Sequence, residues 1–329
     1  MRLGEIFSSG MVFAAKRPIK IFGYGKGTAT VSFAGITKTV ISETEKWCVE
    51  FPPMEYGGAY ELAFTENGNT VLIDDIYIGE VYLFSGQSNM AFKLYESNAE
   101  QSAYRADERL RYIAICPADE VVSWERAGRE NISIWSALGY FVGKEIAENK
   151  DIHIGIILCA SGATVIETWV PEGTFSKIGI NIPMEDKYPD HYKPLYAAKN
   201  KDAYLYNTKL KLVIPYGISG VVWYQGESDA SVAEGKVYEH ELCELIRVWR
   251  ADFECVDLPF CIVQIADCDE RIALGPAWNM IQDAQAKISE HFPNTYTVIS
   301  RDVCETDDIH PPTKDKLAHR IAQVIQTRF

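Results

Sequence analysis

Residues 76–90 read IYIGEVYLFSGQSNM, and the predicted architecture can be worked out from this stretch. An apolar, aromatic-rich run ends abruptly in Ser-Gly-Gln-Ser-Asn, which predicts a buried strand that leads into a tight, glycine-assisted turn. Ser88 would then lie just past the carboxyl end of the strand, where open α/β sheets place their ligand sites. A helix that begins at Asn89 would point its first backbone N–H groups at whatever Ser88 attacks.

The residues that follow this stretch alternate between apolar runs and segments of helical periodicity. Several runs are apolar throughout, as in a parallel sheet that is covered on both faces. The alternation predicts a doubly wound α/β domain over residues 74–329. The predicted strands are IYIGEVYLF, RYIAIC, IHIGIILC, ISGVVWYQ, PFCIVQI and YTVIS, and the predicted helices are residues 136–149, 238–253, 278–291 and 314–327.

Residues 1–73 have a different sequence pattern. Short runs rich in β-branched and aromatic residues are separated by turn signals such as Pro52-Pro53 and Asn67-Gly68, without a helical stretch. Strands at this spacing predict a small all-β sandwich. We therefore expect two domains, an N-terminal β-sandwich of residues 1–73 and a larger α/β domain of residues 74–329.

The charge of the chain argues against two classes of partner. The formal net charge is −14, and basic residues occur only in short mixed runs. Nucleic acids and anionic membranes are bound mainly through basic patches, so we expect neither as a partner. A neutral or weakly charged small substrate fits better, and the sequence does not indicate an oligomeric state.

The eight cysteines show neither a CxxC pair nor a metal-like spacing, and the runs IILCA and PFCIVQI place two of them in apolar surroundings. We expect reduced thiols. The histidines other than His310 lack the paired spacing of a metal site, so no metal and no cofactor is expected. The N-terminus shows no apolar signal-peptide core, and no run approaches the ~18 apolar residues of a membrane span. The expected location is cytoplasmic, or secreted or periplasmic if a signal peptide was removed.

Polar turns that contain glycine also follow two other apolar runs, IHIGIILC and ISGVVWYQ, and a third polar turn, DDIHPP, lies near the C-terminus. Together with the Ser88 turn they have the residue types of an acyl-transfer site. Such a site requires a nucleophile, a base, a group that orients the base, and donors for the developing oxyanion. Ser88 is the candidate nucleophile and His310, in the turn DDIHPP, the candidate base. Asp307 can reach back across the turn to the imidazole, and Asp308 competes for this role. We expect the neighbouring carboxylate to raise the pKa of His310 above ~6.5.

The candidate oxyanion donors are the backbone N–H groups of Ser88 and Gly162 and the side-chain amide of Gln225. Each turn also has a plainer explanation, since a serine after a strand is commonly a helix N-cap and glutamine can satisfy buried backbone groups in a turn. The convergence of several polar turns is what indicates a site. The further candidates for oxyanion or substrate contacts are Gln87, Asn89 and Glu227.

Two other features bear on the site. Residues 171–200 are rich in Pro, Lys and Tyr and weakly patterned, which predicts a long loop, and we place it near the site because long insertions are usually functional or mobile. Trp169, Trp223 and Trp278 lie in or beside apolar runs. We predict that they belong to the core and are not platforms for sugar rings.

The blocks GEVYLFSGQSNM, GVVWYQGESDA and DDIHPPTK, in this order, resemble those of the SGNH hydrolase superfamily. Within it they resemble the sialate O-acetylesterase family, which is similar to certain acetylxylan esterases. The resemblance covers nearly the whole chain, including segments outside the blocks such as MVFAAKRPIKIFGYG and LYNTKLKLVIPYGISG. It implies a flavodoxin-like, doubly wound hydrolase domain preceded by the β-sandwich.

The same resemblance implies a serine carboxylic-ester hydrolase that removes O-acetyl groups from a carbohydrate. Ser88 is the implied nucleophile, His310 the implied base, and Ser88, Gly162 and the region of Gln225 the implied oxyanion contributors. The chain departs from the family at two places. Gly162-Ala163-Thr164 stands where Gly-Gly-Thr is usual, and the asparagine of the third block is missing from the Gln225 turn.

Alternatives stay open at this point. Some relatives work with a Ser–His dyad, so Asp307 need not contribute. The substrate could be acetylated xylan, another glycan or a small ester, because the fold does not select the sugar. A different class of function is a glycan-binding protein without catalytic activity, which the joint presence of Ser88, His310 and Asp307 disfavours.

Overall fold

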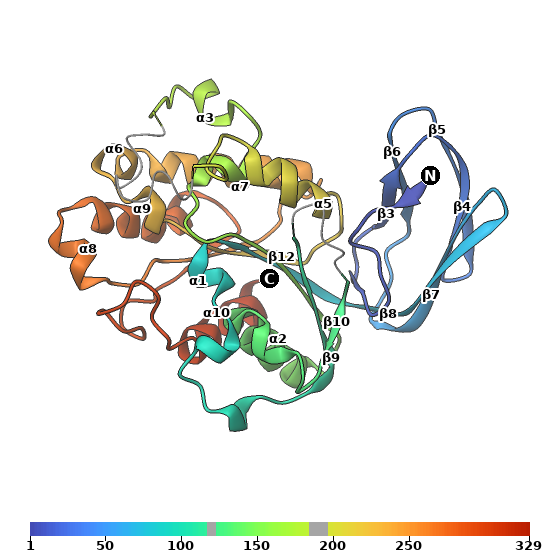
Figure 1. The fold of residues 1–329 in the computed structure, drawn as a ribbon, viewed down its shortest axis with the longest axis horizontal. Helices are drawn as coiled ribbons and strands as arrows, with labels where there is room; N and C mark the ends of the chain where they lie inside the picture. The colour runs from blue at the N-terminus through green and yellow to red at the C-terminus, as the bar shows by residue number, and fades with distance from the viewer. Residues whose placement is uncertain (117–122, 184–196) are drawn as a thin grey trace.

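Strand β8, residues Asn69–Gly86, runs through both parts of the molecule (Figure 1). Its first half pairs antiparallel with β7 (Gly57–Glu66), and its second half pairs parallel with β11 (Ile154–Ala160) and β12 (Gly220–Tyr224). The structure, a computed structural model, describes residues 1–116, 123–183 and 197–329.

The predicted apolar runs form one large sheet around β8. Its strands follow the order β10-β9-β11-β8-β12-β13-β14, and every neighbouring pair is parallel except β10 with β9. The prediction of a mainly parallel α/β sheet is confirmed. The outer strands are β9 (Asp107–Ala114), β10 (Glu125–Ala127), β13 (Phe260–Val263) and β14 (Thr295–Val298).

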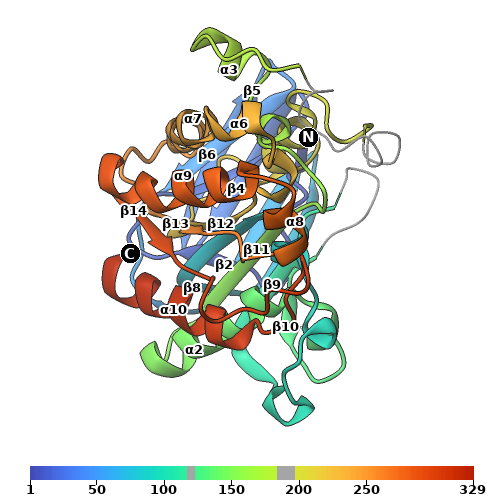
Figure 2. The same cartoon turned by 90° about the vertical axis from the view of Figure 1, so that its left-hand side faces the viewer.

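Helices cover both faces of this sheet (Figures 1 and 2). Helices α2 (Ala137–Lys150) and α10 (Asp315–Arg328) pack together on one face, and α7 (Tyr238–Asp252) and α9 (Ala277–His291) pack on the other. Each begins and ends within one residue of its predicted limits. Shorter helices are α1 (Ser88–Ala91), α3 (Thr174–Lys177), α5 (Lys211–Val213), α6 (Val232–Gly235) and α8 (Asp269–Ala273).

The N-terminal part contains the predicted short strands. Three of them form a separate small sheet, and the others continue the large sheet through the first half of β8. Asn67 and Gly68, both with positive φ, make the turn between β7 and β8 as the sequence indicated. The bounds are β1 (Arg2–Leu3), β2 (Val12–Ala14), β3 (Ile19–Tyr24), β4 (Gly27–Phe33), β5 (Ile36–Ser42) and β6 (Lys46–Phe51).

The hydrophobic core is continuous between the two parts. Tyr216 stacks on Phe13 with ring centroids 5.4 Å apart, and its hydroxyl donates a hydrogen bond of 2.6 Å to the carbonyl of Val12. The predicted boundary between residues 73 and 74 falls inside β8, which does not break there. The division into two domains therefore stays a prediction.

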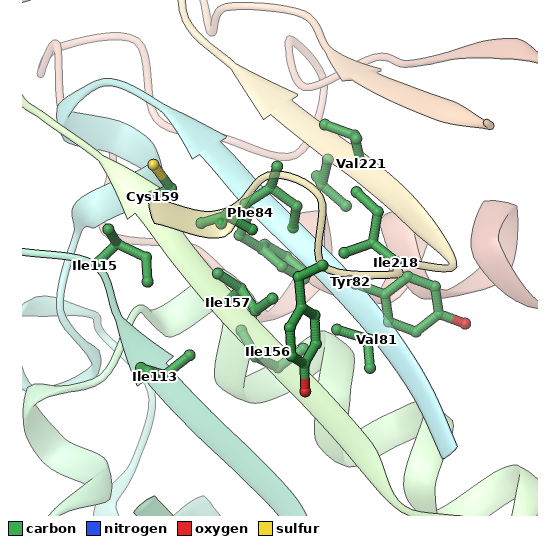
Figure 3. Packing of buried hydrophobic residues seen from close by; sticks show 14 of the residues in the cluster. Val81, Tyr82, Phe84, Ile113, Ile115, Ile156, Ile157, Cys159, Ile218 and Val221 are labelled. Atoms are coloured by element: carbon green, nitrogen blue, oxygen red, sulfur yellow. The ribbon is translucent and has the colours of Figure 1, made fainter. Parts of the chain in front are cut away.

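Buried side chains of the central strands fill the space between sheet and helices. Figure 3 shows Val81 and Phe84 of β8 beside Ile157 of β11, in a cluster that also contains Cys159. No disulfide joins the eight cysteines, all of which are described, and those of the two apolar runs, Cys159 and Cys261, are buried. The prediction that three tryptophans belong to the core is confirmed for Trp169, Trp223 and Trp278.

Among the described helices, none is long and apolar enough to cross a bilayer.

Candidate active site

The turn after β8 is fixed by backbone contacts with its two neighbouring strands. Gly86 has φ +134°, and a Cβ added to it would lie 2.0 Å from the carbonyl oxygen of Tyr224, so glycine alone permits this approach. The N–H of Gln87 donates to the carbonyl of Tyr224 at 3.0 Å, and the N–H of Ser161 donates to the carbonyl of Gly86 at 3.0 Å. Ser88 then begins α1 at the carboxyl end of the central strand.

The structure brings Ser88 and His310 together from positions 222 residues apart. The Nε2 atom of His310 lies 2.7 Å from the Oγ atom of Ser88, and both side chains are half-buried. This is the distance over which a general base takes the proton of a nucleophile. The pair is therefore arranged for nucleophilic catalysis and is still reachable from solvent.

Hydrogen bonds on two sides hold the loop that carries His310. The carbonyl of Ile309 accepts from Asn89 Nδ2 at 2.9 Å, and the carbonyl of Pro312 accepts from the N–H of Asn98 at 3.2 Å. Asn98 Nδ2 also donates to Thr313 Oγ1 at 2.7 Å. Because the backbone is tied on both sides of the imidazole, the position of the ring relative to Ser88 is well defined.

Of the two candidate aspartates, Asp308 is the one that contacts the base residue. Its Oδ1 atom accepts the backbone N–H of His310 at 2.8 Å, and its charge acts to raise the pKa of the imidazole. Both aspartates are exposed. In the described part of the chain, no hydrogen bond joins Asp307 to the ring, so the structure does not bring this predicted site residue into contact with His310.

The pKa of His310 is lowered from its ordinary value of 6.5, and the expectation that it is raised is wrong. Burial removes water from the imidazolium, and this effect exceeds the opposing effects of Asp308 and Glu96. The charge of Lys314 lowers the pKa further. The imidazole is therefore in its neutral, proton-accepting form at neutral pH.

Gly162, which carries one of the two predicted oxyanion donors, lies beside the nucleophile. A Cβ added to Gly162 would lie 3.3 Å from the Cβ of Ser88, which places the two residues side by side. Across residues 1–116, 123–183 and 197–329, neither the N–H of Ser88 nor that of Gly162 donates a hydrogen bond, so both are available to an oxyanion. Asn200 holds this turn, because its Nδ2 donates to the carbonyl of Ala163 at 2.8 Å and its Oδ1 accepts from the N–H of Val165 at 3.0 Å.

Asn200 is the last residue of the loop predicted over residues 171–200, so one end of that loop does adjoin the site. The loop also contains the short helix α3, which the weak sequence pattern did not predict. Residues 184–196 lie outside the described residues.

Gln225 does not lie where an oxyanion donor would be. Its side chain is fully buried, and its amide donates to the carbonyl of Thr164 at 2.8 Å and to the carboxylate of Asp229. Its Oε1 atom accepts from the hydroxyl of Tyr238 at 2.8 Å. Contrary to the prediction, no amide hydrogen is left for an oxyanion, because Gln225 links the turn after β12 to the turn after β11.

Asn89 and Glu227 also make internal contacts in place of the predicted ligand contacts. Asn89 Nδ2 donates to Glu227 Oε1 at 2.7 Å and to the carbonyl of Ile309, and Asn89 Oδ1 accepts from Lys314 Nζ at 2.7 Å. Burial raises the pKa of the Glu227 carboxyl. The sequence pattern gave no role to Lys314, although it stands in the block DDIHPPTK, four residues after the candidate base.

Gln87 belongs to the same framework. Its Oε1 atom accepts the N–H groups of Gly226 at 3.4 Å and Ser228 at 3.3 Å, and the side chain is buried. It therefore connects the nucleophile turn to the turn after β12. Four of the predicted polar residues, Gln87, Asn89, Gln225 and Glu227, thus connect the turns around Ser88.

Replacing Asn89 by alanine should destabilise the protein and reduce its activity. The change removes the group that Lys314 and Glu227 share, and loss of a hydrogen bond to a buried charged group costs ~1.5–3 kcal/mol. Urea unfolding measures the loss. The matched control is Asn98→Ala on the exposed side of the His310 loop, for which we expect ~1 kcal/mol because only neutral or exposed hydrogen bonds are lost. Equal unfolding midpoints for the two variants would contradict the assignment.

One group of carboxylates could hold a metal ion. Glu167, Asp229 and Glu234 each place an oxygen within 4.8 Å of the others. Asp229 already accepts hydrogen bonds from Gln225 and from the N–H of Ile166. The metal-independent reading of the sequence stays a prediction.

Comparisons with known proteins identify the family of the chain. A family model described as carbohydrate esterase, sialic acid-specific acetylesterase, matches residues 78–327. The sialate O-acetylesterases of Homo sapiens and Mus musculus are 25% and 24% identical to the chain over 92% of its length. The chain spans 65% of the length of the human protein and 68% of that of the mouse protein. A crystal structure of a carbohydrate acetylesterase from Xanthomonas citri matches with a TM-score of 0.87 at 26% identity, covering 99% of this chain and 75% of that one.

Proposed function

Because the chain belongs to the carbohydrate esterase family of sialic acid-specific acetylesterases, we propose that it hydrolyses O-acetyl esters on carbohydrates. The observation that carries this proposal is the 2.7 Å contact between His310 Nε2 and Ser88 Oγ, beside the N–H groups of Ser88 and Gly162, which donate to no other described residue. A nucleophile, a base and oxyanion donors are the parts that ester hydrolysis by a serine requires.

In the proposed reaction, Ser88 Oγ attacks the acetyl carbonyl carbon while His310 Nε2 accepts the hydroxyl proton. The oxyanion that forms is stabilised by the N–H groups of Ser88 and Gly162. As the C–O bond to the sugar breaks, His310 returns the proton to the departing sugar hydroxyl, which leaves an acetyl group on Ser88. Water, deprotonated by His310, then attacks this ester, and acetate leaves as Ser88 regains its proton.

For the carboxylate that supports the base, we favour Asp308 over Asp307. Asp308 bonds the backbone of His310, and its negative charge stabilises the imidazolium that forms during the reaction. Asp307, the predicted third member of a triad, is the alternative.

The pH dependence of kcat/KM distinguishes the two aspartates. The neutral imidazole is the active form and burial lowers its pKa, so activity should fall on the acid side with a midpoint below pH 6.5. Asp308→Asn removes a charge that raises the pKa and should move the midpoint further down, whereas Asp307→Asn should leave it in place. The measurement is hydrolysis of p-nitrophenyl acetate across the acid range. A midpoint above 6.5 would contradict the lowered pKa of His310, and a shift in the Asp307 variant alone would identify Asp307 as the carboxylate that supports the base.

The names of the relatives support an O-acetylated sugar as the substrate. Those from human and mouse are sialate O-acetylesterases, and the Xanthomonas citri protein is a carbohydrate acetylesterase. We propose O-acetylated sialic acid as the first candidate, with acetylated xylan, another glycan or a small acyl ester as alternatives.

Acetate release from a panel of substrates tests the proposal. The panel contains O-acetylated sialic acid, acetylated xylo-oligosaccharide and p-nitrophenyl acetate. We expect one sugar to be cleaved far faster than the aryl ester, and that sugar identifies the substrate class. If no acetate is released and a fluorophosphonate probe does not label Ser88 in the folded protein, the glycan-binding alternative becomes the better explanation.

We also propose the finer fold assignment that the family resemblance implied. The five adjacent strands β11-β8-β12-β13-β14, numbered in chain order among themselves, follow the order 2-1-3-4-5, and β9 extends the sheet beyond β11; this order supports a flavodoxin-like, doubly wound domain of the SGNH type. The strands of residues 1–73, in two layers with a shared apolar interior, support an N-terminal β-sandwich.

A further inference from the structure

Lys314 is a buried cation that the proposed reaction does not use. Its side chain is 0% exposed, its Nζ atom donates to Asn89 Oδ1 at 2.7 Å, and it lies 4.7 Å from the ring centroid of Phe92 and 5.9 Å from that of Tyr224. Burying an ammonium group is costly unless its charge is compensated. The burial of the Lys314 ammonium group beside the nucleophile and the base therefore requires a functional explanation.

One amide connects Lys314 to both reacting residues. Asn89 directly follows Ser88, and its Nδ2 atom donates to the carbonyl of Ile309, which directly precedes His310. We propose that Lys314 is a positioning residue, which acts through Asn89 to hold Ser88 and His310 at the distance that the reaction requires. This inference rests on the proposed esterase function of the same site.

The direction of the hydrogen bonds explains why a cation suits this place. An ammonium group only donates, so Asn89 must turn its oxygen toward Lys314. Both hydrogens of Nδ2 are then directed to Ile309 and Glu227, as observed. A neutral acceptor at position 314 would allow the amide to turn over and release the His310 loop.

The charge of Lys314 also acts on its surroundings. It opposes the rise that burial causes in the pKa of Glu227 and contributes to the lowered pKa of His310, whereas Asp308 and Glu96 act to raise the pKa of His310. Burial lowers the pKa of Lys314 itself to about 8, so the ammonium form still predominates at neutral pH. The groups that oppose this lowering are Cys304, Glu227, Glu305 and Asp308.

Two neutral variants separate the charge from the hydrogen bond. Lys314→Met removes both, and Lys314→Gln removes the charge but keeps a donor for Asn89. Lys316→Met, an exposed lysine on the first turn of α10, is the matched control. For each protein we would measure the acid midpoint of kcat/KM, kcat, KM and the thermal unfolding temperature.

We expect both neutral variants at position 314 to raise the acid midpoint, because the charge that lowers the pKa of His310 is gone. Lys314→Met should also lower kcat by about 10- to 100-fold with little change in KM, since misplacement of reacting groups by ~1 Å costs this much. Lys314→Gln should retain more of kcat, and Lys316→Met should match the wild type.

The proposal is overturned if kcat and the acid midpoint both stay at their wild-type values in the two variants, even when the unfolding temperature falls, because that pattern reports a purely structural lysine. If turnover is too slow to follow, the pH dependence of Ser88 labelling by a fluorophosphonate gives the same midpoint. Failure of the esterase proposal is distinguishable, since the wild-type protein would then release no acetate and take up no label.

Discussion

Replacing Ser88 by alanine should reduce kcat for ester hydrolysis by about 10,000- to 1,000,000-fold while the protein stays folded. The hydroxyl is the only part removed, and in the structure it contacts His310 Nε2 at 2.7 Å without supporting the core. His310→Ala should cause a loss of the same size, and the double variant should lose little more, because nucleophile and base act as one unit.

Acetate release or turnover of p-nitrophenyl acetate measures this effect. Ser289→Ala and His319→Ala are matched controls, since both residues are exposed on helices of the larger part of the molecule. We expect wild-type rates from both. Substantial activity in Ser88→Ala would remove Ser88 from the mechanism, and substantial activity in His310→Ala alone would point to another base.

Replacing Gly86 by alanine should prevent stable folding or cost more than about 4 kcal/mol of unfolding free energy. The new Cβ would lie 2.0 Å from the Tyr224 carbonyl oxygen and 2.6 Å from its carbonyl carbon. Both are backbone atoms of β12, so no side-chain rotation can relieve the overlap. Strands β8 and β12 would have to separate at the point where they carry the nucleophile turn.

The variant Gly35→Ala distinguishes the overlap with the Tyr224 backbone from the strain of a positive φ. Gly35 also has a positive φ, +79°, but nothing lies within 4 Å of its added Cβ. We expect it to cost only ~1–2 kcal/mol, the strain of a left-handed residue. Soluble yield and urea unfolding of the two variants provide the comparison, and similar losses would show that the approach of β12 is not what requires Gly86.

Most of the architecture could be predicted because it depends on local pattern. The apolar runs that became β8, β11, β12 and β13 and the periodic segments that became α2 and α10 carry their signal within a few residues. The boundary between the two parts could not be predicted in the same way. The sequence pattern does change near residue 74. Strand β8 nevertheless continues across this position, because one strand can pair with different partners at its two ends.

The pair Ser88 and His310 was identified correctly as residues that would meet, and the Gly162 turn as their neighbour. The turns after β8, β11 and β12 meet because parallel strands bring their carboxyl ends to one edge of the sheet. The supporting residues were not assigned correctly. Gln225 and Asn89 have the amide groups of oxyanion donors, and nothing in the sequence shows where those amides point.

The parallel sheet, the turn that carries Ser88 and the residue types of the chemistry follow from local sequence pattern, because strand periodicity and turn residues act over a few residues. The pairing of the polar groups, in contrast, depends on tertiary contacts. The partners of Asn89 lie 138, 220 and 225 residues away, and no pattern along the chain encodes such contacts. The tertiary structure also decided the direction of the His310 pKa shift, because that direction depends on how much water burial removes, a property of the packed molecule.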